Sequence, residues 1–306
     1  MECRIPALRT RITAPTPLLF AAVGAKITEK SGVLNPGVDR MMLMGAVGGF
    51  MTVTLTGSAT LALFASAFAG AALASSFAVL VLVFQARQVP TGLALTIFGI
   101  GLSALLGQGM IGVAYSGLPK IAIPGLSSIP VLGELLFNHD IMVYLSVILL
   151  LAVAWFMNHT RAGLILRAVG DSHDAAHALG YRVNFIRMLA ILFGGAMAGL
   201  GGAYVSLAYS PLWVEGMTAG RGWIALALVV FASWRAGRIL LGAYLFGGIT
   251  ILQLHAQAVG INVPSQFMSM LPYLATILVL VLISRDQNNI KRNAPASLGK
   301  PFHPGH

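Results

Sequence analysis

Long apolar runs with almost no charge constrain this chain more than any other feature of its sequence. Only 9% of the 306 residues are charged, whereas soluble domains carry about 25%. The runs are continuous rather than alternating, so they predict membrane-spanning helices and not a β-barrel. We therefore expect an all-α, polytopic transmembrane helical bundle with about eight membrane segments. The clear spans are residues 41–55, 59–84, 92–113, 141–157, 188–207, 239–259 and 270–284.

Three further stretches are ambiguous. Residues 17–25 and 222–234 are apolar but too short to cross comfortably at about 1.5 Å per residue. Residues 31–40 contain two glycines and a proline, which fits either broken, re-entrant backbone beside a cavity or an amphipathic surface segment. The sequence leaves open whether residues 17–40 and 222–234 cross fully. It also leaves open whether the N-terminus lies inside or outside.

Small residues are concentrated in the span 188–207 and recur at Gly45 and Gly49. Rows of small residues one helical turn apart let helix backbones approach closely in a membrane. These rows predict a tightly packed helical bundle. A bolder interpretation is that they form a surface on which helices slide past one another. The rows in the span 188–207 consist of Gly194, Gly195, Ala198, Gly199, Gly201 and Gly202.

A charged loop at residues 158–187 separates two of the spans and holds four arginines. Arginine-rich loops stay on the cytoplasmic side, so we place this one in the cytoplasm. Within it, Asp171 or Ser172 can cap a short helix, and Gly180 suits a left-handed stop. Such a helix indicates a docking element for a soluble partner, and the alternative is a solvated connecting loop. Its small apolar face would be Ala175, Ala176, Ala178 and Leu179.

Catalytic and metal-binding patterns find little support in the sequence. No HExxH, nucleophile elbow or P-loop occurs, so we expect no catalytic residue, no cofactor and no ATP bound by this chain. His173 and His177 have the i, i+4 spacing of metal ligands, but no third ligand accompanies them, and we expect no metal. The net charge of +10 is spread over loops and both ends, where membrane topology explains it, so we expect no nucleic-acid partner.

Acidic side chains are absent from the predicted spans. Proton- or sodium-driven transporters usually place acids inside their spans, so this absence argues against a self-powered pump. A lone histidine in a span, His255, fits either a proton relay or a packed side chain. The acids outside the charged loop and the two ends of the chain all fall in expected connectors: Glu29, Asp39, Glu134, Asp140 and Glu215.

The connector at residues 209–221 is the other stretch that can carry function. Trp213 offers a flat face on which a ring could stack, and Glu215 and Arg221 offer polar contacts, so we take these three as candidates for the translocation path. The alternative for the tryptophan is an aromatic belt at the membrane interface.

Four segments together resemble the permease subunits of ABC importers. The nearest group is the branched-chain amino acid and simple-sugar permease superfamily, and within it the smaller permease of nucleoside (purine-type) importers. The likeness runs over roughly residues 17–285. The segments are SGVLNPGVDRMMLMGA, NHTRAGLILRAVGDSHDAAHALGYRV, GGAMAGLGGAYVSL and WVEGMTAGRGWIALALVVFASW.

The resemblance implies roles for particular positions. The segment from Gly170 to Gly180 would be a cytoplasmic coupling helix seated in a groove of the ATPase, with Ala175 and Ala176 as its close-packed face and Arg167 and Asp171 beside that contact. The region of Asn35 would line the translocation path. In place of the family's usual NLGVEGMM this chain reads NPGVDRMM, so that Pro36 removes a backbone donor and Arg40 replaces a small residue.

The resemblance also implies the organisation and the partners. Residues 1–16 would form a basic N-terminal segment, residues 17–284 the permease domain, and residues 285–306 a basic cytoplasmic tail. The chain would be a multi-pass protein of the bacterial inner membrane, surrounded by membrane lipid. A cytoplasmic ABC ATPase would drive it, a second, larger permease would complete a heterodimer, and an extracytoplasmic substrate-binding lipoprotein would deliver nucleosides or related purine compounds.

Other functions stay open at this point. Within the same class, the substrate could be a simple sugar or a branched-chain amino acid. Outside it, the chain could be a stand-alone channel or secondary carrier. An intramembrane enzyme would need clustered acids or histidines facing one cavity, and the sequence shows none.

Overall fold

The computed structural model describes residues 13–122, 138–258 and 293–303, together with a few positions between 264 and 278. The predicted span 270–284 therefore lies mostly outside the described residues, as do residues 1–12, Glu134 and the side chain of His255. The elements in chain order are α2 (Thr16–Lys30), α3 (Val38–Thr56), α4 (Ala59–Ala78), η1 (Val79–Val83), α5 (Gln88–Gly107), η2 (Gln108–Met110), β1 (Lys120–Ala122), β2 (Asn138–Asp140), α7 (Ile141–His159), α8 (Arg161–Asp171), α9 (His173–Ala178), α10 (Val183–Tyr204), η3 (Val205–Tyr209), α11 (Arg221–Phe231) and α12 (Ala236–Ala258).

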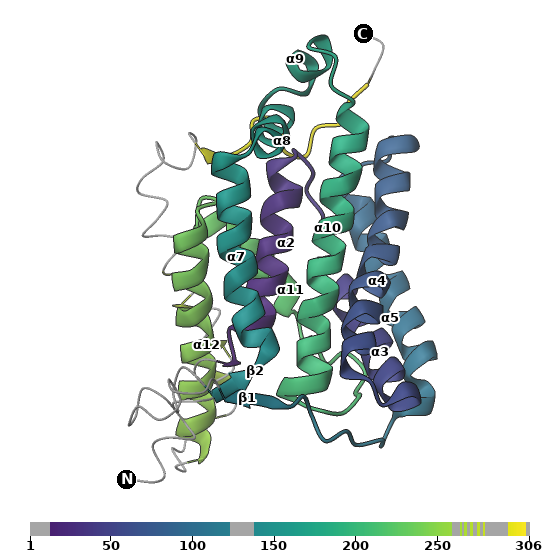
Figure 1. Cartoon of the computed structure of the whole chain (residues 1–306), viewed down its shortest axis with the longest axis vertical. Helices are drawn as coiled ribbons and strands as arrows, with labels where there is room; N and C mark the ends of the chain where they lie inside the picture. Colours follow the sequence, from purple (N-terminus) through teal and green to yellow (C-terminus); the bar gives the residue numbers. More distant parts are fainter. Residues whose placement is uncertain are drawn as a thin grey trace.

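Six helices in the described part of the chain are long and apolar enough to cross a membrane, which confirms the predicted all-α polytopic bundle. They run side by side along the long axis (Figure 1). The only described sheet is the short antiparallel pair β1–β2, in which Lys120 lies opposite Asp140. The six spans are Val38–Thr56, Ala59–Val83, Gln88–Met110, Ile141–His159, Val183–Tyr209 and Ala236–Gln253.

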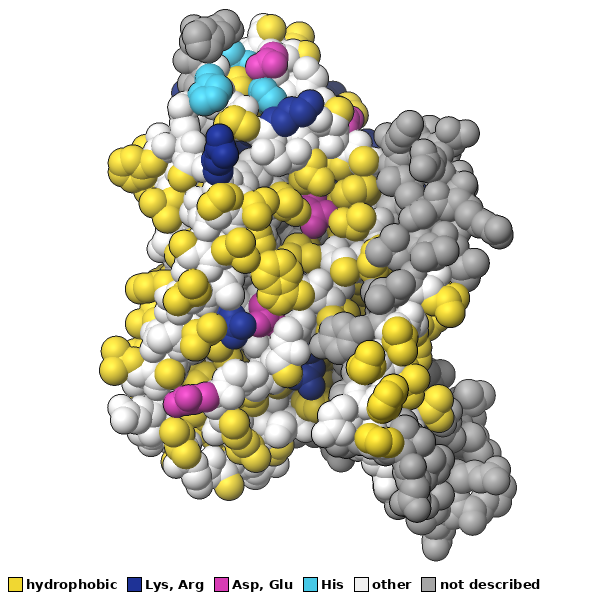
Figure 2. Space-filling model, turned by 180° about the vertical axis from the view of Figure 1, so that it is seen from behind, with side chains coloured by type: hydrophobic (Ala, Val, Ile, Leu, Met, Phe, Trp, Pro, Cys, Tyr) yellow, Lys and Arg dark blue, Asp and Glu magenta, His cyan; other side chains and the backbone are white. Residues whose placement is uncertain are grey.

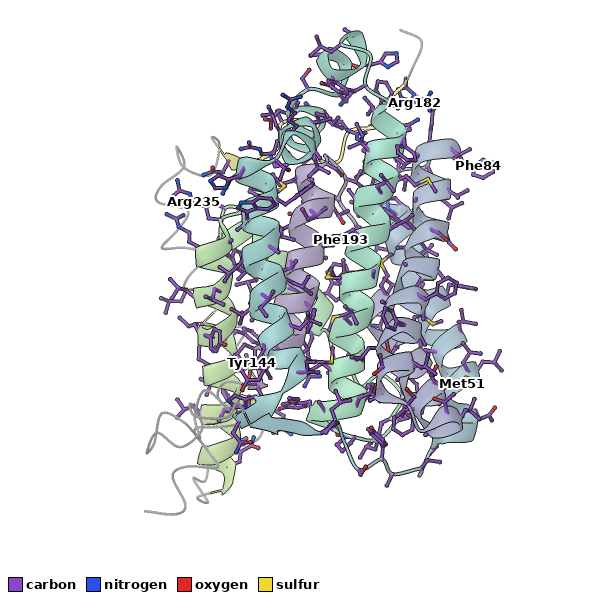
Figure 3. All side chains as sticks on the ribbon, viewed as in Figure 1. Met51, Phe84, Tyr144, Arg182, Phe193 and Arg235 are labelled. Carbon is purple, nitrogen blue, oxygen red and sulfur yellow. The ribbon has the colours of Figure 1, made fainter. Side chains whose placement is uncertain are left out.

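Charged side chains gather at one end of the bundle, which we call the basic end. It carries α8, α9, Arg182 and Arg235 (Figures 1 and 3). On the face turned away in Figure 1, histidine and basic side chains again cluster around α9, while hydrophobic side chains cover most of the height below (Figure 2). This division into an apolar belt and a charged end is what a bilayer requires of a spanning protein.

Helix α2 is the centre of the bundle, although the sequence made it look too short to cross. Only its last residue is not buried, and it runs antiparallel to α10 (Figure 1). A Cβ on Gly201 would lie 2.9 Å from the carbonyl oxygen of Pro17, and Thr28 Oγ1 donates to the carbonyl of Ala190. The chain therefore enters α2 from the end opposite the basic end. A 15-residue helix is long enough here because neighbouring helices, and not lipid, surround it.

Two helices begin inside the bundle. Residues 31–37 leave the basic end as buried, non-helical backbone, and α3 starts where Arg40 packs against Gly99, near the middle of α5. Helix α11 starts against Asp39 and ends near the basic end, where Trp234 bonds to Glu29. The broken-backbone interpretation thus holds for residues 31–37, whereas residues 38–40 already belong to α3, and the surface-segment alternative is wrong. Residues 222–234 supply a half-length helix.

Glycine makes the contacts of α10 possible, as the small-residue rows predicted. A Cβ added to Gly199 would lie 2.2 Å from the carbonyl oxygen of Ser66 on α4, and one added to Gly202 would lie 1.7 Å from that of Met42 on α3. Gly45 meets the backbone of Gly199 in the same way. No side chain fits at these crossings, so helices α2, α3 and α4 pack directly on the α10 backbone.

We expect Gly199→Leu to prevent correct packing, because a side chain there must push α4 away, at a cost of about 3 kcal/mol or more. The matched control is Gly101→Leu: Gly101 also lies in a span, but a Cβ there meets nothing within 4 Å. Thermal unfolding and size-exclusion profiles in detergent measure both. Similar midpoints for the two variants would contradict the packing described here.

Candidate functional site

The loop at residues 158–187 folds into two short helices where the sequence predicted one. Thr160 caps α8, accepting from the backbone N of Gly163 at 3.0 Å. Ser172 caps α9, accepting from the backbone N of Ala175 at 3.3 Å, and Gly180 ends it with φ +87°. The predicted cap and stop are therefore confirmed, while Asp171 is the last residue of α8 instead of a cap.

The six residues expected to couple to a partner do not share one surface. Asp171, Ala175 and Gly180 are exposed. Ala176, by contrast, is 2% exposed and packs inside this chain. Gly170 is also buried, and Arg167 is partly buried. The face that α9 offers to another protein is consequently the one that carries Ala175.

Gly170 brings α8 onto the end of α2. A Cβ at this position would lie 2.1 Å from the carbonyl oxygen of Lys30, the last residue of α2. The backbone of Gly170 also accepts a hydrogen bond from the N–H of Ser297 at 2.9 Å. Direct backbone contact leaves no flexible side chain between the two helices, so a displacement of α8 acts on α2 directly.

Arg187, in the first turns of α10, joins three parts of the basic end. Its side chain is almost fully buried, and Nε donates to the carbonyl of Ser31 at 3.1 Å. Nη1 donates to the carbonyl of Lys300 at 3.3 Å, and Nη2 lies 3.4 Å from Nδ1 of His173. The guanidinium therefore holds the end of α2, the start of α9 and the C-terminal segment together.

Burial lowers the pKa of His173 below its ordinary value, and the positive charge of Arg187 adds to that shift. The neutral imidazole is favoured as a result. Because arginine can only donate, Nδ1 of a neutral His173 is the acceptor in this contact.

The C-terminal segment 293–303 lies across the basic end, which the sequence did not suggest. Ser297 Oγ donates to the carbonyl of Asp171 at 3.3 Å, and the N–H of Gly299 donates to the carbonyl of Gly32 at 3.1 Å. Phe302 is 7% exposed, and its ring lies 5.4 Å from that of His173 and 5.3 Å from that of His177. The two histidines with metal-ligand spacing thus flank an aromatic ring.

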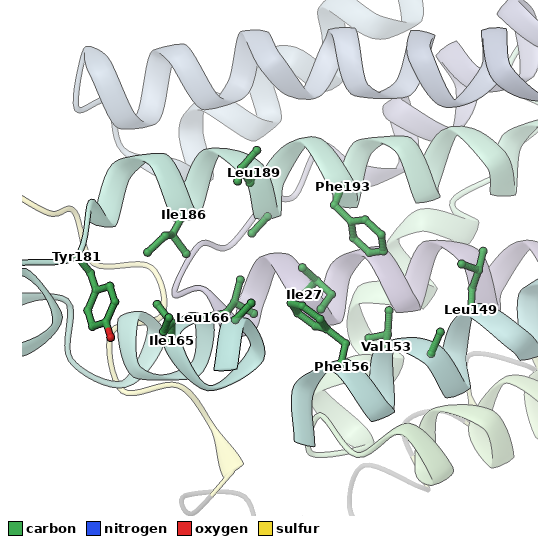
Figure 4. Close-up of a pocket in the computed structure, with 13 residues that line it drawn as sticks. Ile27, Leu149, Val153, Phe156, Ile165, Leu166, Tyr181, Ile186, Leu189 and Phe193 are labelled. Atoms are coloured by element: carbon green, nitrogen blue, oxygen red, sulfur yellow. The ribbon is translucent and has the colours of Figure 1, made fainter. Parts of the chain in front are cut away.

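An apolar cavity of about 640 Å³ lies beneath α8. Ile27 of α2 and Ala190 of α10 line it on the bundle side, while Phe156 and Phe193 face each other across it (Figure 4). Protein interiors are usually close-packed. This cavity, however, opens to the surface of the bundle, since Leu189 in its lining is 52% exposed. The helices of this chain therefore leave space beneath α8.

Carboxylates are buried in the bundle, contrary to the expectation that its acids lie in connectors. Glu29 and Asp39 are each 1% exposed, and Asp140 is 8% exposed. Each accepts a hydrogen bond from this chain: Trp234 Nε1 donates to Glu29 at 2.7 Å, and Tyr204 Oη donates to Asp140 at 3.3 Å. The sequence argument against a self-powered pump therefore loses its premise, and these contacts show instead that the carboxylates join helices.

Asp39 joins the two helices that start inside the bundle. Its Oδ1 accepts from the N–H of Gly222 at 2.9 Å, and its Oδ2 accepts from Thr218 Oγ1 at 3.2 Å. The Arg40 guanidinium lies 3.4 Å from the same carboxylate. A carboxylate at the start of a helix offsets the partial positive charge of its free N–H groups. Asp39, in the first turn of α3, thereby caps α11.

The candidate path residues fall into two regions. Asn35 is 3% exposed, and its Oδ1 accepts from the N–H of Gly37 at 3.0 Å in the turn before α3. Arg221 begins α11, donates to the carbonyl of Met217 at 2.8 Å and stacks 5.4 Å from the Tyr209 ring. Both therefore flank the α3–α11 junction. Glu215 is exposed.

The burial of Trp213 contradicts the aromatic-belt alternative, while its place in the translocation path stays a prediction. Trp213 is 1% exposed, and a Cβ on Gly107 would lie 2.0 Å from its Nε1. It is therefore a core side chain seated against the end of α5, and not a ring at the membrane interface.

Two glycines of α5 accommodate the sequence departures near Asn35. A Cβ on Gly92 would lie 2.4 Å from Pro36, and one on Gly99 would lie 2.7 Å from the Cβ of Arg40. The larger residues thus fit because α5 has no side chain opposite them. These glycines lie in a different span from Pro36 and Arg40, so the sequence could not link them without knowledge of the fold.

A multi-pass helical bundle, in which a half-length helix meets the start of a longer one at a buried polar junction, is the architecture of a membrane permease. The family model described as the branched-chain amino acid transport system / permease component matches residues 10–282. The chain belongs to this family and is an ABC transporter permease, a multi-pass protein of the plasma membrane.

Three relatives match over most of their length. A glucose ABC transporter permease protein of Haloferax volcanii, TsgC13, whose assignment is provisional, is 39% identical over 97% of this chain and 97% of its own. The nucleoside permease NupC of Lactococcus lactis is 33% identical over 87% and 88%, respectively. The guanosine permease NupQ of Bacillus subtilis is 30% identical over 94% and 93%. No solved structure matches the chain.

Two of these organisms also have a second protein that matches this chain, with lower sequence identity. The guanosine permease NupP of Bacillus subtilis is 26% identical over 88% of this chain but 79% of its own length. The glucose permease TsgB13 of Haloferax volcanii is 23% identical over 88% of this chain and 74% of its own.

We expect Asp39→Ala to destabilise the fold by about 3 kcal/mol, because it leaves the N–H of Gly222 and the hydroxyl of Thr218 without an acceptor inside the bundle. Asp39→Asn retains one acceptor oxygen and should cost about 1 kcal/mol. Unfolding followed by tryptophan fluorescence in detergent measures both, with the exposed Glu215→Ala as control. Equal losses for Asp39→Asn and Glu215→Ala, or none for Asp39→Ala, would contradict the capping role.

Proposed function

We propose that this chain is a transmembrane permease subunit of an ATP-driven importer for nucleosides or related purine compounds. Residues 17–284 form half of the translocation path, and residues 285–306 form a tail on the cytoplasmic face. ATP is hydrolysed by a separate ATPase subunit, and an extracytoplasmic binding lipoprotein delivers the substrate.

The basic end is the cytoplasmic end in this proposal. Arg161, Arg167, Arg182 and Arg235 all belong to elements at that end. Arginine in short loops is retained on the cytoplasmic side during insertion. The parity of the described helices agrees: α10 leaves the basic end, α11 returns to it from the junction, and α12 leaves it again (Figure 1).

One observation carries the proposal: an exposed helix at the basic end is joined by backbone contact to the buried centre of the bundle. Helix α9 presents Ala175 outward, while α8 presses Gly170 onto the end of α2. Arg187 adds hydrogen bonds between the same parts. A solvated connecting loop would need none of these contacts.

The mechanism follows from this linkage. Closure of the ATPase displaces α9 and α8, and the apolar cavity beneath α8 admits the movement. Because Gly170 contacts Lys30 directly, α2 shifts with α8 against the glycine face of α10. The α3–α11 junction, which holds Asn35 and Arg221, then changes its access from one side of the membrane to the other.

A second, larger permease completes the path in this proposal. The relatives support it, since Bacillus subtilis and Haloferax volcanii each hold one protein that this chain matches over nearly its full length and one that it spans only to 79% or 74%. Helix α2 is already buried by the other helices of this chain, so the second permease contacts the outer helices of the bundle.

A sugar is the second candidate substrate, favoured by one specific observation. The relative with 39% identity is the provisional glucose permease, whereas the nucleoside and guanosine permeases are 33% and 30% identical. Both substrates are uncharged and rich in hydroxyl groups. The buried polar junction suits either.

We expect Ala175→Arg to reduce substrate uptake at least about tenfold while ATP hydrolysis by the assembled complex persists, because the new side chain disturbs a helix seated in the ATPase. Uptake and ATPase activity in proteoliposomes measure both. The matched control, Ala114→Arg, introduces the same exposed charge at the opposite end and should leave coupling intact. Unchanged uptake by Ala175→Arg would contradict the docking role.

Competition identifies the substrate. Uptake of radiolabelled guanosine by the reconstituted complex should be suppressed by unlabelled nucleosides and not by glucose or leucine. Guanosine transport that glucose abolishes, or glucose uptake that nucleosides leave unchanged, would favour the sugar importer. Transport by the purified chain without an ATPase would contradict an importer of either kind.

A further inference from the structure

A second cavity, of about 490 Å³, opens at the basic end between α2, α7, α8 and the turn that joins α11 to α12. Its two walls differ. One is apolar and comes from α7, while the other is basic and comes from three different elements. The apolar wall is Leu151, Ala154 and Met157, and the basic wall is Lys26, Lys30, Arg167 and Arg235.

The basic wall has no acidic partner among the described lining residues. Glu29 lies between the two lysines on α2. Its Oε2 accepts from Trp234 Nε1, and its Oε1 has no hydrogen-bond partner among the described residues. Asp171 acts electrostatically on Lys30 from α8. Among the described residues, four cations around this cavity still exceed these two acids, and like charges held together favour an anion between them.

Polar atoms in the cavity wall lack partners in the described chain. Ser233 is fully buried, and its Oγ makes no hydrogen bond. Nε of Arg167 is buried and equally unpaired. Lys26 is only 5% exposed. Buried polar groups are nearly always satisfied in folded proteins, so the unpaired Ser233 Oγ and Arg167 Nε point to an acceptor-rich ligand.

The start of α12 also borders the cavity, through Ala236 and Gly237. The first N–H groups of a helix have no partner within it and attract anions, phosphate above all. This 23-residue helix therefore adds its positive end to the four cationic side chains.

We propose that this cavity binds the phosphate group of an anionic phospholipid from the leaflet at the basic end. The phosphate lies among Lys26, Arg167, Ser233 and the start of α12. The acyl chains follow α7, where Leu151 is 60% exposed. The combination of a basic and an apolar wall selects an amphiphile over a soluble anion.

Native mass spectrometry of the full-length chain, titrated with phosphatidylglycerol or phosphatidylcholine of identical acyl chains, tests this. We expect phosphatidylglycerol to bind about tenfold more tightly, and the double variant Lys26→Gln, Arg167→Gln to lose about that factor. Lys26→Arg, Arg167→Lys keeps both charges and should retain binding. The control Arg87→Gln removes an exposed cation from the α4–α5 turn and should not change it.

Each other outcome overturns the proposal. Equal affinity for the two lipids, or the same loss in Arg87→Gln, would show general surface electrostatics. Displacement of phosphatidylglycerol by inorganic phosphate, added in excess at constant ionic strength, would assign the cavity to a soluble anion. If the double variant aggregates, the exposed Arg235→Gln variant replaces it. We expect it to lose about fivefold in affinity for phosphatidylglycerol, which is the equivalent of about 1 kcal/mol per cation. An unchanged affinity of Arg235→Gln would count against the site.

Discussion

Direct backbone contact along α10 is the constraint on which the rest of this structure depends. Lipid gives helices no hydrophobic reason to associate, so they associate by close packing. At Gly199 and Gly202 the backbones of α4 and α3 occupy the space that a Cβ would need. Gly24 and Gly194 extend the same contact to α2. A short helix such as α2 can therefore sit in the centre of the bundle without facing lipid.

The same principle recurs at the basic end, where it has a functional consequence. Gly170 lets α8 touch the end of α2, and Arg187 ties both to α9 and to the C-terminal segment. Side-chain contacts can absorb a displacement by changing rotamer, whereas backbone contacts transmit it. The cavity under α8 and the capped α3–α11 junction are the two places that can yield. In the proposed mechanism, movement enters at α9 and is expressed at the junction.

Local and periodic signals were read correctly from the sequence, and long-range ones were not. The apolar runs, the Ser172 cap and the glycine rows each depend on neighbours within a few residues or on one helix face. The burial of α2 could not be predicted, because it depends on helices far along the chain. Asp39 bonds to Gly222, and Phe302 lies between two histidines more than a hundred residues earlier. The burial of Ala176, one of the expected coupling residues, was missed for the same reason, because Ala176 packs in one cluster with Phe302.

The orientation of α9 can be measured directly in cells. In a chain with Cys3→Ser, cysteine is introduced once, at Ala175 or, as a control at the opposite end, at the exposed Val214. A membrane-impermeant maleimide should label the Val214→Cys protein in intact cells. It should label the Ala175→Cys protein only after permeabilisation, and removal of the ATPase subunit should increase that labelling. Labelling of Ala175→Cys in intact cells would contradict the central claim that α9 is a cytoplasmic docking helix.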